Sequence, residues 1–115
     1  MEKTPSIKGF DPEKFIPLRS TKISKIIETR EGIYAIVRRF ENGIDFVYWG
    51  FGDIRETILS AYKIPEVQVY SQRYAIPIPF LHLYPMVEWG KEHLDDFRKN
   101  YPTRDARLNP STTTE

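Results

Sequence analysis

Cysteine is absent from this chain of 115 residues, and histidine occurs only at His82 and His93. The first absence excludes disulfide bonds, thiolate metal sites and cysteine nucleophiles. Two histidines make a histidine-based zinc site unexpected. The chain also lacks the apolar run of a signal peptide or of a membrane-spanning segment. We therefore expect an intracellular, cytoplasmic protein with no metal, no small-molecule cofactor and no membrane partner.

Motifs of catalysis are missing as well. There is no G-x-S-x-G, and the glycines are isolated, so neither serine hydrolase chemistry nor a phosphate-binding loop is indicated. Glu88, Glu92 and Asp96 recur every four residues beside His93, a pattern typical of the solvated face of a helix. A nuclease would need clustered carboxylates with a lysine at strand spacing. The sequence therefore predicts a protein that is not an enzyme.

Neither sign of charge dominates the chain, since 17 Lys and Arg oppose 16 Asp and Glu for a net charge of +1. This balance predicts neither a strongly basic coat for nucleic acid nor an acidic mimic of DNA. The hydrophobic share of 40% is ordinary for one globular domain of this length. Scarce Asn and Gln with frequent Ile, Tyr, Lys, Arg and Glu are typical of thermophile proteins, so we expect an archaeal or viral origin.

The clearest positive signal is a β-hairpin between Gly32 and Phe51. Two runs rich in β-branched and aromatic residues flank Asn42-Gly43, a pair that favours tight hairpin turns. Taken as a two-residue loop, this turn places on one face the cross-strand pairs Phe40 with Asp45, Arg38 with Val47, Ile36 with Trp49, and Tyr34 with Phe51, because side chains alternate with period two.

The remaining segments complete an α+β pattern. Strands are expected at residues 21–29, 33–40, 44–51, 66–75 and 80–84, and helices at 53–63 and 85–101. Asp53 is the expected N-cap of the first helix, and Pro85 the first residue of the second. The order β-β-β-α-β-α predicts an antiparallel sheet of three to five strands, with a β-meander at its start and two helices packed on one face.

Proline and polar residues mark the limits of the expected domain. Residues 1–20 form a proline-containing extended arm, whose apolar side chains Phe10, Phe15, Ile16 and Leu18 dock on the body or on a neighbouring subunit. Residues 21–101 form the single α+β domain. Residues 102–115 hold almost nothing apolar and are expected to be a disordered tail.

The small residues Ala35 and Gly50 suggest that the helices cover their side of the hairpin, which leaves the opposite face open. Rings alternating with cations are typical of surfaces that bind single-stranded nucleic acid, where bases stack at ~1–3 kcal/mol each. Residues 19–39 add six basic residues against two acidic ones. We therefore predict a small non-catalytic protein that binds single-stranded DNA or RNA. The candidate binding residues are Lys22, Lys25, Tyr34, Arg38, Arg39, Phe40, Trp49, Phe51 and Arg73.

The alternative is a protein–protein interaction module that uses the same face as a homodimer or partner surface. Such a module would be an inhibitor, an adaptor or an assembly subunit, of viral origin in one version of this alternative. Aromatic and β-branched residues are what strands prefer in any case, so their presence alone does not imply a ligand. The exposure of Trp49 decides whether the aromatic face can bind nucleic acid. If Trp49 is shielded within one subunit, there is no basis for an open aromatic face.

Overall fold

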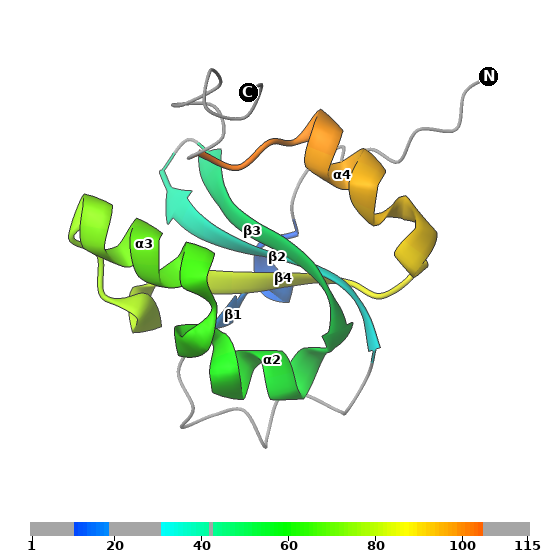
Figure 1. Cartoon of the computed structure of the whole chain (residues 1–115), viewed down its shortest axis with the longest axis horizontal. Coiled ribbons are helices and arrows are strands. Elements are labelled where there is room, and N and C mark those ends of the chain that lie inside the picture. Colours follow the sequence, from blue (N-terminus) through cyan, green and yellow to red (C-terminus); the bar gives the residue numbers. More distant parts are fainter. Residues whose placement is uncertain (1–10, 19–30, 42, 105–115) are drawn as a thin grey trace.

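A computed structural model describes residues 11–18, 31–41 and 43–104 of the protein. Its elements are η1 (Pro12–Lys14), β1 (Ile16–Pro17), β2 (Glu31–Phe40), β3 (Gly43–Asp53), α2 (Ile54–Ser60), η3 (Ala61–Lys63), α3 (Pro65–Tyr74), η4 (Ile78–Phe80), β4 (His82–Met86), η5 (Lys91–His93) and α4 (Leu94–Asn100) (Figure 1). The four strands form one antiparallel sheet in the order β1-β4-β2-β3. The predicted α+β class is confirmed.

Strand β2 is central, because β3 pairs with one of its edges and β4 with the other. The hairpin of β2 and β3 is confirmed, and so is the short strand expected at residues 80–84, which forms as β4. A β-meander would place the strand that precedes β2 in the sequence directly beside it. In the structure, β4 pairs with that edge of β2 instead. The strand predicted for residues 21–29 lies outside the described residues.

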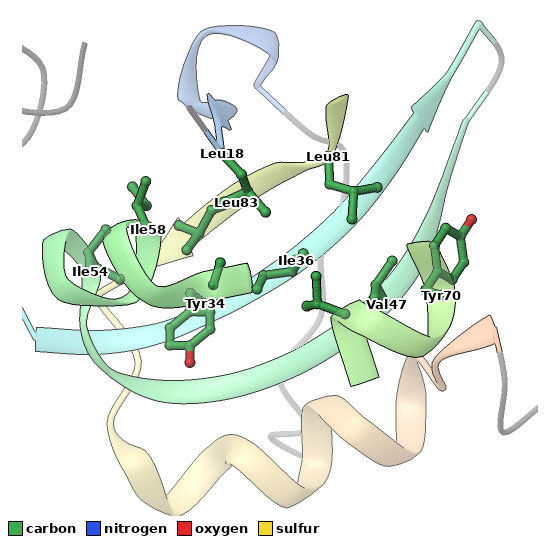
Figure 2. Close-up of a cluster of buried hydrophobic side chains, with 11 residues drawn as sticks. Leu18, Tyr34, Ile36, Val47, Ile54, Ile58, Tyr70, Leu81 and Leu83 are labelled. Atoms are coloured by element: carbon green, nitrogen blue, oxygen red, sulfur yellow. The ribbon is translucent and has the colours of Figure 1, made fainter. Parts of the chain in front are cut away.

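Helices cover both faces of the sheet, so the prediction that they pack on one face is wrong. In Figure 1 the strands pass between α4 on one side and α2 with α3 on the other. Helices α2 and α3 cover a largely aliphatic cluster, whose labelled members in Figure 2 are Leu18, Tyr34, Ile36, Val47, Ile54, Ile58, Tyr70, Leu81 and Leu83. Helix α4 covers a second cluster that is rich in rings, with Ile33, Ala35, Val37, Phe46, Trp49, Tyr84, Met86 and Phe97.

The segment predicted as a fourth strand, residues 66–75, is instead the helix α3. Pro65 occupies its first turn, where a missing N–H costs nothing. Val67 and Tyr70 are buried at helical spacing, and Ala75 ends the helix in the left-handed region at φ 56°. The Ser71 hydroxyl then donates to the carbonyl of Ile76 at 2.6 Å. Burial at helical spacing thus overrides the strand-like composition of this segment.

The two helix starts predicted from the sequence have opposite outcomes. Helix α2 begins as expected, because the Asp53 carboxylate accepts a hydrogen bond from the Glu56 backbone N–H at 3.0 Å. Helix α4 begins only at Leu94, whereas Pro85 lies in β4 opposite Tyr34. Strand β1 pairs with β4 only at His82 and Leu83. Pro85 therefore lies in the part of β4 that has only β2 as a neighbour.

The N-terminal arm docks on the body as predicted in the part that the structure describes. Leu18 is buried in the aliphatic cluster, and the Phe15 ring packs edge-on against Tyr84 with centroids 4.8 Å apart. Ile16 pairs with Leu83. Phe10 and residues 105–115 lie outside the described residues. The chain continues past the expected domain end at residue 101, and Arg104 contacts β3 there.

Candidate functional site

The hairpin has a register different from the one predicted, because β3 carries an extra residue. Ile36 pairs with Tyr48 and Val37 with Phe46, so Val47 forms a β-bulge. Both Val47 and Tyr48 contact the aliphatic cluster, whereas Phe46 joins the ring-rich cluster. The bulge therefore changes the alternation of side chains midway along the strand.

This register places the candidate residues on different faces from those predicted. Arg38 pairs with Asp45 rather than with Val47. Trp49 packs in the ring-rich cluster under α4, whereas Tyr34 belongs to the aliphatic cluster on the other side of the sheet. The predicted face that would join Tyr34, Arg38 and Trp49 does not exist as one surface.

Trp49 is a core residue with 1% of its surface exposed. Its ring stacks on those of Phe46 and Phe97, with centroids 5.2 and 5.0 Å away. Its indole N–H donates to the Tyr101 carbonyl oxygen at 2.9 Å. Phe51 is half-buried against the same cluster. The expectation that the Trp49 ring faces water is therefore wrong, because α4 covers it, and Phe51 is only partly exposed.

Tyr34 is buried as well, on the other face. Gly50 makes room for its ring, since a Cβ at residue 50 would lie 2.5 Å from the Tyr34 hydroxyl oxygen. Burial raises the pKa of this hydroxyl. The small size of Gly50 thus makes room for the ring of Tyr34 on the neighbouring strand. The sequence had suggested that it makes room for a helix.

The remaining candidates lie at the end of the hairpin or outside it. Arg39 and Phe40 are exposed at the end of β2, and Arg38 is half-buried beside them. Arg73 is exposed on α3 instead of on a strand. Lys22 and Lys25 lie outside the described residues, so their part in a site stays a prediction.

Two cation–ring pairs stand at this end of the hairpin. The guanidinium carbon of Arg38 lies 4.6 Å from the ring centroid of Phe40, and that of Arg39 lies 4.2 Å from that of Phe15. Because neighbouring side chains of a strand point to opposite faces, each face of the hairpin end carries one pair. The Phe40 ring is 47% exposed. We call Phe15, Arg38, Arg39 and Phe40 the hairpin-end surface.

A polar cluster lies next to this surface, built from four parts of the chain. Arg38 comes from β2, Asp45 from β3, Tyr70 and Tyr74 from α3, and Arg104 from the segment after α4. The Tyr70 hydroxyl donates to Asp45 Oδ2 at 3.1 Å, and Arg104 Nη1 lies 3.8 Å from Asp45 Oδ1. The rings of Tyr70 and Tyr74 contact each other with centroids 4.5 Å apart. We call these five residues the Asp45 cluster.

The Asp45 cluster keeps its donors protonated at neutral pH. Burial raises the pKa of Tyr70 to about 12, and contact with Arg38 works against that rise. Figure 2 shows Tyr70 at the margin of the aliphatic cluster, with its hydroxyl directed away from the other side chains. The neighbouring Tyr74 hydroxyl, and then the charge of Asp45, raise the pKa of Arg104. Two guanidinium groups therefore face one carboxylate, which leaves the cluster with a positive charge.

A hollow of about 280 Å³ lies along β3. It is lined by Val47, Tyr48, Trp49, Glu66, Arg98, Pro102 and Thr103. Arg98 Nη2 donates to the Trp49 carbonyl oxygen at 3.3 Å across this hollow. Together with the bulge at Val47, that contact protects an edge strand against pairing with other chains.

Residues 11–18, 31–41 and 43–104 show neither a metal centre nor a membrane-spanning helix. No group of three or more His, Asp or Glu side chains there could hold a metal ion. None of the helices in these ranges has the length and apolar character needed to cross a membrane.

Sequence reasoning missed three members of the Asp45 cluster. Tyr70 and Tyr74 are spaced by four residues, which is about one helical turn, but the composition of the segment favours a strand. Arg104 carried no signal, since it follows the expected end of the domain. No family model, no curated protein and no solved structure matches the chain.

Proposed function

We propose that this protein is a small, non-catalytic binding protein of the cell interior that holds single-stranded DNA or RNA at its hairpin-end surface. The observation that carries this proposal is the exposed Phe40 ring with the Arg38 guanidinium 4.6 Å from its centroid. Exposed rings stack on bases regardless of sequence, and guanidinium groups hold the phosphates between them.

The location of this surface differs from the one expected from the sequence. Trp49 and Tyr34 are shielded by helices and cannot stack on a base, so they are not part of the proposed site. The end of the hairpin extends beyond the buried part of β2, which spans Gly32 to Val37. The proposal therefore uses Arg38, Arg39 and Phe40 of the original candidates.

Fluorescence anisotropy with a labelled oligothymidylate tests the proposal. Phe40→Ala is expected to weaken binding roughly 5- to 150-fold, the loss of one stacking contact of ~1–3 kcal/mol. Arg39→Met is expected to weaken binding and to reduce its dependence on salt, because each phosphate contact releases counterions. Leu59→Ala is the matched control, since Leu59 is an exposed apolar residue on α2.

Two results would end the proposal. Wild-type protein that shows no binding, or binding that does not weaken with salt, excludes phosphate contacts. Equal losses in the Phe40 and Leu59 variants would show that binding does not depend on the hairpin-end surface.

A protein-interaction module is the second candidate function. Leu59, Tyr62 and Val69 are large apolar residues exposed on α2, η3 and α3, outside the hairpin-end surface. Such residues fit an inhibitor, an adaptor or an assembly subunit that binds a protein partner or a second copy of this chain. Light scattering separates the candidates, because a stable dimer that Leu59→Arg dissociates, without oligonucleotide binding, favours this second function.

A further inference from the structure

We propose that Tyr74 and Arg104 form a subsite for a phosphate group at the edge of the Asp45 cluster. The Tyr74 hydroxyl and the Arg104 Nε are both buried atoms without a well-formed hydrogen bond to any of the described residues. Buried polar atoms in proteins are almost always paired with protein, water or ligand. Contact with the Tyr74 hydroxyl oxygen already raises the pKa of Arg104, so the donors that remain without an acceptor are the Tyr74 hydroxyl proton and the Arg104 Nε–H. Both suit an acceptor oxygen of a bound ligand.

The two donors lie side by side. The Arg104 guanidinium carbon is 6.0 Å from the ring centroid of Tyr74. The Arg104 side chain is 39% exposed, whereas that of Asp45 is 13% exposed, so the arginine can be reached from water while its partner is largely covered. A ligand can therefore approach Arg104 without displacing the core of the cluster.

The charge of the surroundings selects an anion. Arg38 and Arg104 outnumber the single carboxylate of Asp45, and Tyr70 already satisfies one oxygen of that carboxylate. The distance of 3.8 Å between Arg104 and Asp45 is longer than a charge-assisted hydrogen bond, so the guanidinium keeps donors for a second acceptor. Guanidinium with a hydroxyl donor beside it is a combination that suits the oxygens of phosphate.

Two kinds of ligand can supply the phosphate group that this subsite binds. One is the backbone of the nucleic acid, a choice that rests on the function proposed above. Arg38 links the two regions, since it lies over the Phe40 ring and also contacts Tyr70. The other source is a free phosphate or a phosphate monoester, which needs no contact with Phe40.

Titration calorimetry of the full chain with inorganic phosphate, and separately with the oligothymidylate, tests the subsite. Arg104→Met is expected to weaken phosphate binding roughly 10-fold or more, because it removes a charged hydrogen bond. Tyr74→Phe is expected to weaken it roughly 3- to 10-fold through the loss of one hydroxyl donor. Arg55→Met on α2 is the matched control and is expected to bind as the wild type does.

A third variant separates a ligand site from a merely structural cluster. Asp45→Asn removes the competing negative charge and is expected to tighten phosphate binding roughly threefold to tenfold. A cluster that only stabilises the fold predicts no gain of affinity from this change. Circular dichroism of each variant shows that it is folded before its affinity is compared.

The outcomes distinguish the subsite from the proposed function. Phosphate binding that depends on Tyr74 and Arg104, without oligonucleotide binding, supports the subsite for free phosphate and ends the nucleic-acid function. Oligonucleotide binding that is lost in Phe40→Ala but unchanged in Tyr74→Phe and Arg104→Met overturns the subsite alone. Absence of binding of both inorganic phosphate and the oligothymidylate by the wild type also overturns it.

Discussion

The middle and the end of one hairpin differ in what surrounds them, although the same two strands build both. In the middle, Ile33 to Val37 and Trp49 are covered by helices on both faces of the sheet. At the end, Arg39 and Phe40 emerge from under the helices into water. The comparison teaches that, within this hairpin, the ring most open to a ligand lies where the strands extend beyond the helices, and not on the covered face of the sheet.

The largest expected contrast is between Trp49 and Phe40. Trp49→Ala removes a buried ring that contacts Phe46 and Phe97, and it is expected to lower the free energy of unfolding by about 3–5 kcal/mol. Phe40→Ala removes an exposed ring and is expected to change it by less than about 0.5 kcal/mol. Denaturant unfolding measures both. Equal destabilisation by the two variants would remove the distinction between middle and end.

Two glycines of β3 give a smaller contrast of the same kind. Gly50→Ala brings a Cβ within 2.5 Å of the Tyr34 hydroxyl oxygen and 2.7 Å of its ring carbon Cζ, so the buried ring must shift. We expect a loss of about 1–3 kcal/mol in unfolding free energy. Gly43→Ala meets nothing within 4 Å at the end of the hairpin, and thermal unfolding should show little change. A tolerant Gly50 would mean that Tyr34 is not held tightly.

Tyr70, where the aliphatic cluster meets the Asp45 cluster, gives a pH-dependent contrast. Its pKa is about 12 in the folded protein against 10.0 for an ordinary tyrosine, so between these values the folded protein keeps a proton that the unfolded chain loses. The free energy of unfolding is unaffected by this group below pH 10 and falls by up to about 3 kcal/mol as the pH rises through 12.

Tyr70→Phe is therefore expected to flatten the fall in unfolding free energy between pH 10 and pH 12. The same variant loses the hydrogen bond to Asp45 and is expected to be less stable by about 1 kcal/mol at pH 7. Denaturant unfolding at several pH values measures both effects. Tyr62→Phe, at an exposed position of η3, is the control. An unchanged pH profile in Tyr70→Phe would show that this hydroxyl is not desolvated.

The sequence was enough to predict the hairpin, the first helix with its Asp53 cap, the short strand β4 and the docking of the arm. These features depend on local turn, cap and proline chemistry, which acts within a few residues. Both sides of β2 are apolar in mid-strand, which favours a strand covered on both faces, whereas the small residues Ala35 and Gly50 favour helices on one face only.

The site could not be predicted, because it depends on effects that are not local. The bulge at Val47 shifts the register and moves Trp49 to the other face, and no residue near the turn indicates it. The strand-like composition of α3 hid the helical spacing of Tyr70 and Tyr74. Arg104 reaches Asp45 only after the chain has crossed the sheet, a contact between residues that are distant in the sequence.

Mapping of backbone amide shifts by NMR during titration with an oligothymidylate tests the central claim most directly, namely that the hairpin end is the binding surface. The prediction is that the largest shifts occur at Arg38, Arg39 and Phe40, with smaller ones at Asp45 and Tyr74, and none at Leu59. Shifts centred on α2 and η3, or no shifts at all, would contradict it.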